Sequence, residues 1–237
     1  MGSEETVAIR KADERGKGDH GWLQSRFTFS FADYYDPNHM GYRALRVIND
    51  DLIAAGQGFG THPHRDMEIV SYVVEGALEH KDSMGNGSVV RPGDVQRMSA
   101  GTGIRHSEFN PLQDQPMRLL QIWIEPEQKG LAPGYEQTHI GADQKRNRLT
   151  LIASRDGRDG SVTIHQDAAI FASIVAPAQR VERATDPARY QWIQIVEGHA
   201  TINGHAVERG DGLSLTGATH LEIEAVTETE LLLFDLA

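Results

Sequence analysis

Cysteine is absent from this chain of 237 residues. Without a thiol, the protein has no disulfide, no thiolate metal site and no cysteine nucleophile. Histidine and the carboxylates therefore remain as candidate metal ligands, and the sequence contains 11 His beside 34 Asp and Glu.

Long hydrophobic runs and basic clusters are also missing. No apolar segment approaches the length of a membrane span, and Met1-Gly-Ser-Glu-Glu5 lacks the basic and apolar regions of a signal peptide. The 23 basic residues are scattered and the net charge is −11, whereas nucleic-acid binding needs a positive surface. We therefore expect a soluble, cytoplasmic protein that binds neither membranes nor nucleic acids directly.

Short runs of β-branched and aromatic residues are separated by glycine and proline turns at Gly76, Gly85-Asn-Gly87 and Pro92-Gly93. This spacing predicts an all-β sandwich or barrel rather than alternating strands and helices. In Phe27–Phe31, aromatic and small polar residues alternate with the period of a half-buried strand. We interpret these aromatic side chains as core packing.

The second half of the chain repeats the first in outline. Three pairs of segments correspond: Val73-Val-Glu-Gly76 with Ile195-Val-Glu-Gly198, Arg91-Pro-Gly-Asp94 with Glu208-Arg-Gly-Asp211, and Leu119–Ile124 with Leu231–Leu236. We therefore predict two tandem β domains, residues 1–135 and residues 136–237.

Two short motifs in the first half carry candidate metal ligands. Side chains two apart on a strand share a face, so His62 and His64 form one pair and His106 and Glu108 another. If the two strands face each other across a small barrel, three imidazoles and one carboxylate converge. Such a set suits Fe, Mn, Ni, Co, Cu or Zn, and Glu68 has the parity to replace Glu108.

Glycines frame both pairs in a recognisable way. The patterns Gly56-x5-His62-x-His64-x3-Glu68 and Gly103-x2-His106-x3-Asn110 resemble the two motifs of the cupin superfamily. The chain departs from that pattern at Gly101, where cupins have proline, and at Gly76, which lies one residue late. The resemblance implies two cupin β-barrel or jelly-roll domains, a bicupin, with the metal site in the first.

A closer resemblance is to the pirin family, over most of the first 130 residues. The segments of this chain that carry the resemblance are Thr61-His-Pro-His-Arg65, Val74-Glu-Gly76, Pro92-Gly-Asp94 and Ser99-Ala-Gly-Thr-Gly-Ile-Arg-His-Ser-Glu108. Generic cupins take the glutamate of the first motif, here Glu68, as a ligand. The pirin pattern instead implies His62, His64, His106 and Glu108, with Glu68 behind them.

Pirin-like proteins of this type are associated with quercetin 2,3-dioxygenase activity. The resemblance implies a metal-dependent oxidoreductase that opens a flavonol with O₂ and releases carbon monoxide. It implies one divalent transition metal per chain, with Fe as the first candidate and Mn, Ni, Co, Cu or Zn as the others. Glu108 is the expected catalytic proton acceptor. Two alternatives stay open: a non-catalytic, redox-responsive regulator with a protein partner, and a metal enzyme for another small enolic substrate.

The second half does not repeat the chemistry of the first. It contains no His between His165 and His199, where an H-x-H pair would fall. Gly217-Ala-Thr-His220-Leu-Glu222 imitates the second motif but has no partner pair. We expect no second metal site, with His220 on the surface, and we place His39 in an exposed loop.

Overall fold

The computed structural model describes residues 5–237, which form β-strands joined by turns and a few very short helices. This confirms the predicted all-β class, although each half consists of two separate sheets rather than one closed barrel. Residues 1–4, part of the segment inspected for a signal peptide, lie outside the described range. None of the helices within residues 5–237 is long and apolar enough to span a membrane.

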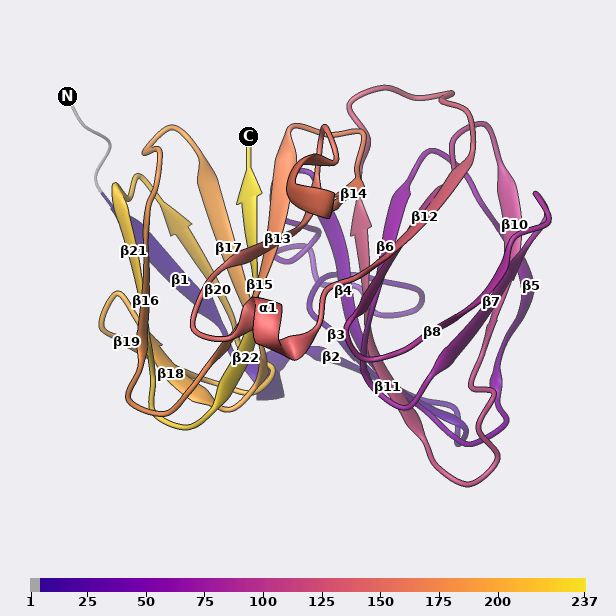
Figure 1. Cartoon of the computed structure of the whole chain (residues 1–237), viewed down its shortest axis with the longest axis horizontal. Coiled ribbons are helices and arrows are strands. Elements are labelled where there is room, and N and C mark those ends of the chain that lie inside the picture. The colour runs from indigo at the N-terminus through magenta and orange to yellow at the C-terminus, as the bar shows by residue number, and fades with distance from the viewer. Residues whose placement is uncertain (1–4) are drawn as a thin grey trace. The chain divides into compact units, whose positions relative to one another are not determined.

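The first compact unit to be described, the metal-site unit, contains Gly16–Ile140 and Val162–Gln166. One sheet has the strand order β12-β9-β6-β11-β4-β3-β2 and the other the order β5-β10-β7-β8 (Figure 1). The strands are β2 (Gly16–Asp19), β3 (Leu23–Phe27), β4 (Leu45–Ile53), β5 (Gly58–His64), β6 (Glu68–Glu75), β7 (Leu78–Asp82), β8 (Gly87–Val90), β9 (Asp94–Ser99), β10 (Ile104–Phe109), β11 (Met117–Ile124), β12 (Gly134–His139) and β14 (Val162–Thr163).

The second unit, the apolar unit, contains the described residues up to Arg15 together with Gly141–Ser161 and Asp167–Ala237. Its own strands have the orders β1-β20-β17-β22-β15-β13 and β16-β21-β18-β19. The elements are β1 (Thr6–Arg10), η1 (Ala12–Glu14), α1 (Ala142–Lys145), β13 (Thr150–Ser154), η2 (Arg158–Gly160), β15 (Ala168–Val175), β16 (Arg180–Ala184), β17 (Tyr190–Glu197), β18 (His199–Ile202), β19 (His205–Glu208), β20 (Gly212–Thr216), β21 (His220–Ala225) and β22 (Thr229–Leu236).

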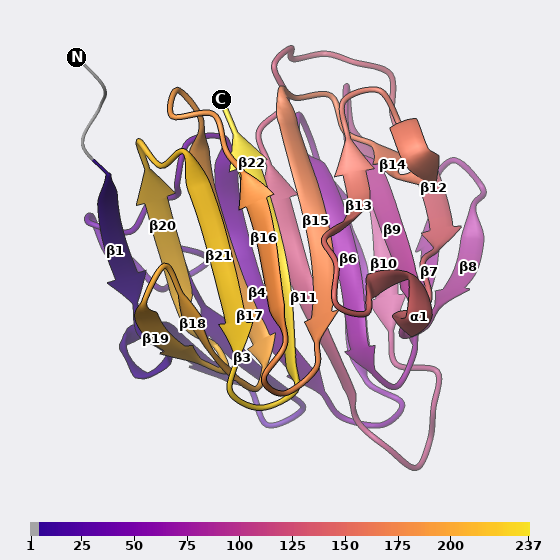
Figure 2. The same cartoon turned by 60° about the vertical axis from the view of Figure 1, so that its left-hand side comes forward.

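These units differ from the predicted ranges 1–135 and 136–237, chiefly at the start of the chain. Strand β1 pairs with β20 of the apolar unit, and Figure 2 shows the two side by side. The buried carboxylate of Asp211 fixes the following segment, because it accepts hydrogen bonds from Lys11 Nζ and the backbone of Ala12, both at 2.8 Å. Local sequence contains no signal for such a distant pairing, so a division of the chain at one point does not include it.

The central strands of the metal-site unit are apolar runs buried on both faces. In β6 and β11 nearly every side chain is buried, as expected for strands in the middle of a covered sheet, whereas β4 is fully buried on one face only. Two apolar clusters result: one includes Leu23, Ile53, Leu78 and Leu119, and the other includes Ile69, Met98 and Ile104.

The predicted half-buried strand over Phe27–Phe31 is wrong in its extent. Strand β3 ends at Phe27, and Thr28 and Ser30 are buried as fully as the aromatic residues beside them. The segment leaves the sheet in a turn, where Ser30 donates its hydroxyl proton to the carbonyl oxygen of Asp36. This turn brings Phe27 and Phe31 into contact, with ring centroids 5.6 Å apart.

Candidate metal centre

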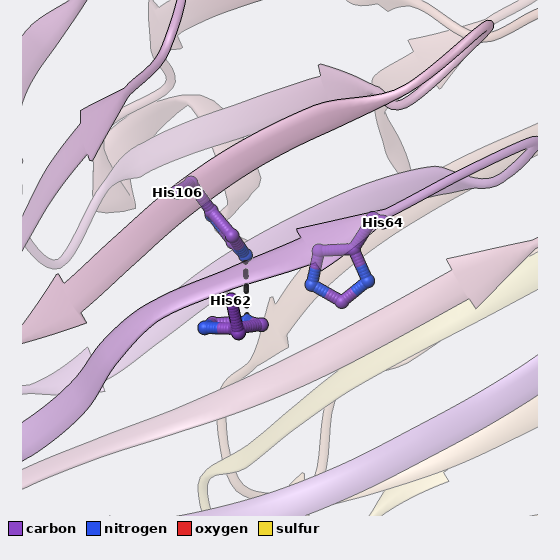
Figure 3. Close-up of side chains that lie close together, drawn as sticks. All are labelled: His62, His64 and His106. Carbon is purple, nitrogen blue, oxygen red and sulfur yellow. Dashed lines mark hydrogen bonds between the residues drawn. The ribbon is translucent and has the colours of Figure 1, made fainter.

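The two motif strands are neighbours in one sheet. Strands β5 and β10 pair antiparallel with His106 opposite His62 and Ile104 opposite His64. The expectation that they face each other across a barrel is therefore wrong, although the parity argument holds. Residues directly opposite in a strand pair share a face, so the three imidazoles gather on one side of the sheet (Figure 3).

Glycines make this strand pair possible. Gly56 precedes β5 with φ +66°, and Gly103 precedes β10 with φ +140°, conformations that favour glycine. Gly58 lies opposite Phe109, and a β-carbon at Gly58 would collide with the carbonyl oxygen of Glu108. The glycine framework seen in the sequence thus shapes the backbone that carries the histidines.

The three imidazoles lie close enough to share one ion. His62 Nε2 and His106 Nε2 are 2.9 Å apart, and the candidate ligand atoms of His62, His64 and His106 all lie within 4.8 Å of one another. Imidazole ligands about 2.1 Å from a metal and at right angles would be about 3 Å apart, which matches the first distance. His64 Nε2 is buried and has no hydrogen-bond partner among residues 5–237. This donor set fits a transition metal.

The surroundings of His64 and His106 favour the neutral imidazole, the form that binds a metal. Burial, reinforced by the neighbouring His62, lowers the pKa of His64 to about 4. Burial, with the three nearby histidines, likewise lowers the pKa of His106 far below its ordinary value.

Glu108 is buried beside this cluster rather than inside it. A bulge between His106 and Glu108 in the pairing with β5 changes the register, and the carboxylate lies within 4.8 Å of ligand atoms of His106 and His80. Gln121 Nε2 donates to its Oε2 at 2.8 Å, and Ser71 Oγ to its Oε1 at 3.4 Å. Burial raises the pKa of Glu108 to about 7. Its ligation, like that of the histidines, stays a prediction.

The alternative carboxylate, Glu68, points elsewhere. It lies three residues from Ser71 on β6, so its side chain leaves the opposite face of that strand. Its carboxylate accepts a hydrogen bond from Ser99 Oγ at 2.8 Å and lies 3.3 Å from His165 Nδ1. In the described chain it does not join the group formed by the three histidines.

Sequence reasoning missed His80 and Asp82, which lie on β7 next to β10. His80 Nδ1 is 3.4 Å from His106 Nδ1, and His80 Nε2 is 3.3 Å from a carboxylate oxygen of Asp82. Asn86 holds that carboxylate through Nδ2 at 2.8 Å. Such outer contacts orient a ligand imidazole. The two-residue spacing of His80 and Asp82 was the available signal.

The histidines open into a cavity of about 230 Å³ between the two sheets. His62, His64 and Glu108 line one part of it, and aromatic and polar side chains of β3, β4 and β11 line the rest. The lining thus includes residues that the sequence analysis assigned to the core or did not single out: Ser25, Phe27, Phe31, Asn49, Asp51, Phe59, Gln121 and Trp123.

The two histidines expected outside the site lie outside it. His39 sits in a loop, 2.8 Å from a carboxylate oxygen of Asp36. His220 is exposed in the apolar unit, near Glu182 and Glu222.

Comparison with known proteins identifies relatives along nearly the whole chain. Residues 8–124 match the family model described as Pirin, and residues 151–236 match the quercetinase C-terminal cupin domain. The chain is 51% identical over 230 residues to quercetin 2,3-dioxygenase of Escherichia coli strain K12, covering 97% of this chain and 98% of the relative. It is 39% identical to a pirin-like protein of Caulobacter vibrioides, covering 95% and 97%.

A solved structure shows the same fold with a metal. The crystal structure of the bacterial pirin YhhW from Escherichia coli in complex with nickel(II) superposes with a TM-score of 0.93 at 50% identity, covering 98% of this chain and 99% of that one. The suspected family and the two cupin-type domains are thereby confirmed.

Proposed function

Because this chain belongs to the pirin family of cupin proteins, we propose that it is a metal-dependent dioxygenase that cleaves a flavonol such as quercetin and releases carbon monoxide. The observation that carries this proposal is the convergence of three imidazoles, two of which line an aromatic-walled cavity in the metal-site unit. The names of the relatives support the substrate class, and the nickel complex of YhhW supports a bound metal.

His62, His64 and His106 would hold the metal, with Glu108 as a fourth ligand. A divalent transition metal with open positions supplies Lewis acidity and oxygen chemistry at this place. We keep iron as the first candidate, with nickel supported by the YhhW complex and Mn, Co, Cu and Zn also suited to the ligands.

Glu108 has a second task, which is to accept the proton of the flavonol hydroxyl at a carboxylate oxygen. Its geometry supports that role, because the carboxylate lines the cavity and is held by Gln121 and Ser71. A fixed base near the substrate needs no reorganisation when the proton moves.

The aromatic side chains position the substrate and exclude water. Phe27, Phe31, Phe59 and Trp123 line the cavity, and Trp22 packs edge-on against Phe59. Flat aromatic walls suit a planar ligand, since offset stacking and edge contacts both add to area burial.

The test begins with anaerobic metal analysis and quercetin turnover with carbon monoxide detection, for the wild type, His62→Ala and His220→Ala. We expect metal and carbon monoxide from the wild type and from His220→Ala, the matched surface control, and neither from His62→Ala. Metal without carbon monoxide under every metal loading would sink the dioxygenase proposal. The regulatory and other-substrate alternatives would then remain.

A further inference from the structure

Asn49 and Asp51 stand out on the cavity wall contributed by β4. Both side chains are nearly fully buried, and both line the cavity that His62, His64 and Glu108 also line. They lie two apart on one strand and so share a face. The histidines belong to the other sheet, so the cavity has polar groups on two opposing walls.

One acceptor oxygen of each side chain on this second wall lacks a partner in the described part of the chain. Asn49 Oδ1 and Asp51 Oδ1 are buried atoms with no hydrogen-bond partner among residues 5–237. Buried polar atoms of a folded protein are nearly always paired, so two orphans facing one cavity call for an explanation.

Neighbouring Gln121, which lies opposite Asn49 on β11, shows what a purely structural amide does here. Gln121 uses both ends of its side chain: Nε2 donates to Glu108, and Oε1 accepts from Trp123 Nε1 at 3.3 Å. Asn49 lies beside Gln121 on the same face of the sheet, but the side-chain oxygen of Asn49 accepts no hydrogen bond from the described residues and is free to accept one from a ligand.

We propose that Asn49 and Asp51 form a substrate-recognition site that accepts hydrogen bonds from a second polar group of the substrate. This rests on the proposed function and narrows its substrate class. The substrate is a planar aromatic molecule with one acidic hydroxyl toward the histidines and at least one further hydroxyl or N–H donor toward β4.

Two observations agree with this assignment. Ser25 lies opposite Asp51 on β3 and also lines the cavity, so the acceptors sit in a polar recess within an aromatic lining. The Asp51 carboxyl hydrogen-bonds Ser25, yet burial still raises its pKa to about 7, which agrees with an acceptor oxygen that has no partner within residues 5–237.

The experiment measures binding of two probes to the metal-loaded protein under anaerobic conditions, by tryptophan fluorescence. Quercetin carries hydroxyls beyond the one at position 3, and 3-hydroxyflavone lacks them. We expect the wild type to bind quercetin about tenfold or more tightly than 3-hydroxyflavone, and Asp51→Leu and Asn49→Leu to lose most of this preference. Asp51→Leu should also unfold at no lower a temperature than the wild type.

Phe31→Leu is the matched control, because it trims the same cavity without touching an acceptor. It should weaken both probes by a similar factor and keep their ratio. If Asp51→Leu does not fold, Asn49→Leu and Asp51→Asn decide the question. An unchanged preference in folded variants overturns the inference, as does equal binding of both probes by the wild type.

Carbon monoxide release, measured in parallel, separates this inference from the proposed function. Selective binding without carbon monoxide would leave the recognition site standing while the dioxygenase proposal falls. Carbon monoxide release without a preference for quercetin over 3-hydroxyflavone would support the dioxygenase proposal and overturn the recognition site.

Discussion

Each unit has a four-stranded sheet, and the two sheets arrange their strands in the same way along the chain. The side chains on their inner faces differ: they include polar groups in the metal-site unit and are apolar in the other unit. In β5-β10-β7-β8, the paired strands β5 and β10 turn His62 and Glu108 toward the cavity, and His106 lies opposite His62 in the strand pair. In β16-β21-β18-β19, the corresponding pair turns Val181 and Ile223 inward, where both join a large apolar cluster. One position in the fold thus holds the proposed metal ligands in one unit and hydrocarbon side chains in the other.

The two inner faces differ because the motif histidine falls on a different face of its strand in each unit. His106 is the third residue of β10 and is buried, whereas His220 is the first residue of β21 and is exposed. In β21 the buried residues are Leu221, Ile223 and Ala225, which alternate with His220, Glu222 and Glu224. A shift of one residue moves every side chain of a strand to the other face. The G-x2-H-x-E spacing is therefore identical in both halves, but only the first half aims it inward.

The largest effect should come from copying the apolar interior into the metal-site unit. His106→Leu should reduce the bound metal from about one ion per chain to almost none, because a central imidazole is lost. Metal analysis and circular dichroism together check this. A folded variant with undiminished metal would refute the assignment of His106 as a ligand.

The next effect should appear in the apolar unit. Leu221→Ala removes a fully buried side chain from the large cluster and should lower the free energy of unfolding by about 3 kcal/mol. Urea denaturation measures the loss. Metal content should stay at the wild-type level, and a parallel fall in metal would contradict the independence of the two interiors.

A smaller, pH-dependent effect should follow from Asp51→Asn in metal-free protein. The folded-state pKa of Asp51 is about 7, above its ordinary 3.8, so the wild type loses stability as pH rises between those values. The variant escapes this loss and should gain about 2 kcal/mol relative to the wild type by pH 5.5, with little gain at pH 4, since one pKa unit corresponds to about 1.4 kcal/mol. Denaturant midpoints at both pH values decide, and a gain that is larger at pH 4 would contradict the argument.

The smallest effect should follow from changing the outward-facing imitation motif. His220→Ala combined with Glu222→Gln should alter the free energy of unfolding by less than about 0.5 kcal/mol, because both side chains face solvent or lie at its edge. Metal titration of this double variant should match the wild type. A lost binding step would reveal a second site and remove the contrast between the units.

Sequence reasoning reached the fold class and the histidine cluster because both depend on short-range periodicity. The parity of His62 and His64 and of His106 and Glu108 could be counted along the chain. That β5 and β10 would be neighbours could not be counted, since strand adjacency depends on the whole sheet.

For the same reason His80 and Asp51 escaped notice. Each gains its significance from the strand beside it, β10 for His80 and the cavity wall of β3 and β11 for Asp51. The bulge that sets Glu108 opposite Phe59 is likewise a property of the strand pair. Such features require the register, which no local pattern contains.

The pairing of β1 with β20 has a consequence for folding kinetics. Thr6 pairs with Thr216, so 216 − 6 = 210 positions separate the partners along the chain. A ribosome releases β1 long before β20, and such long-range pairing forms slowly. The segments of the metal-site unit from Gly16 to Ile140 can collapse earlier, while β1 waits as an unpaired strand. The apolar unit is therefore the last part of the protein to reach its final form during synthesis.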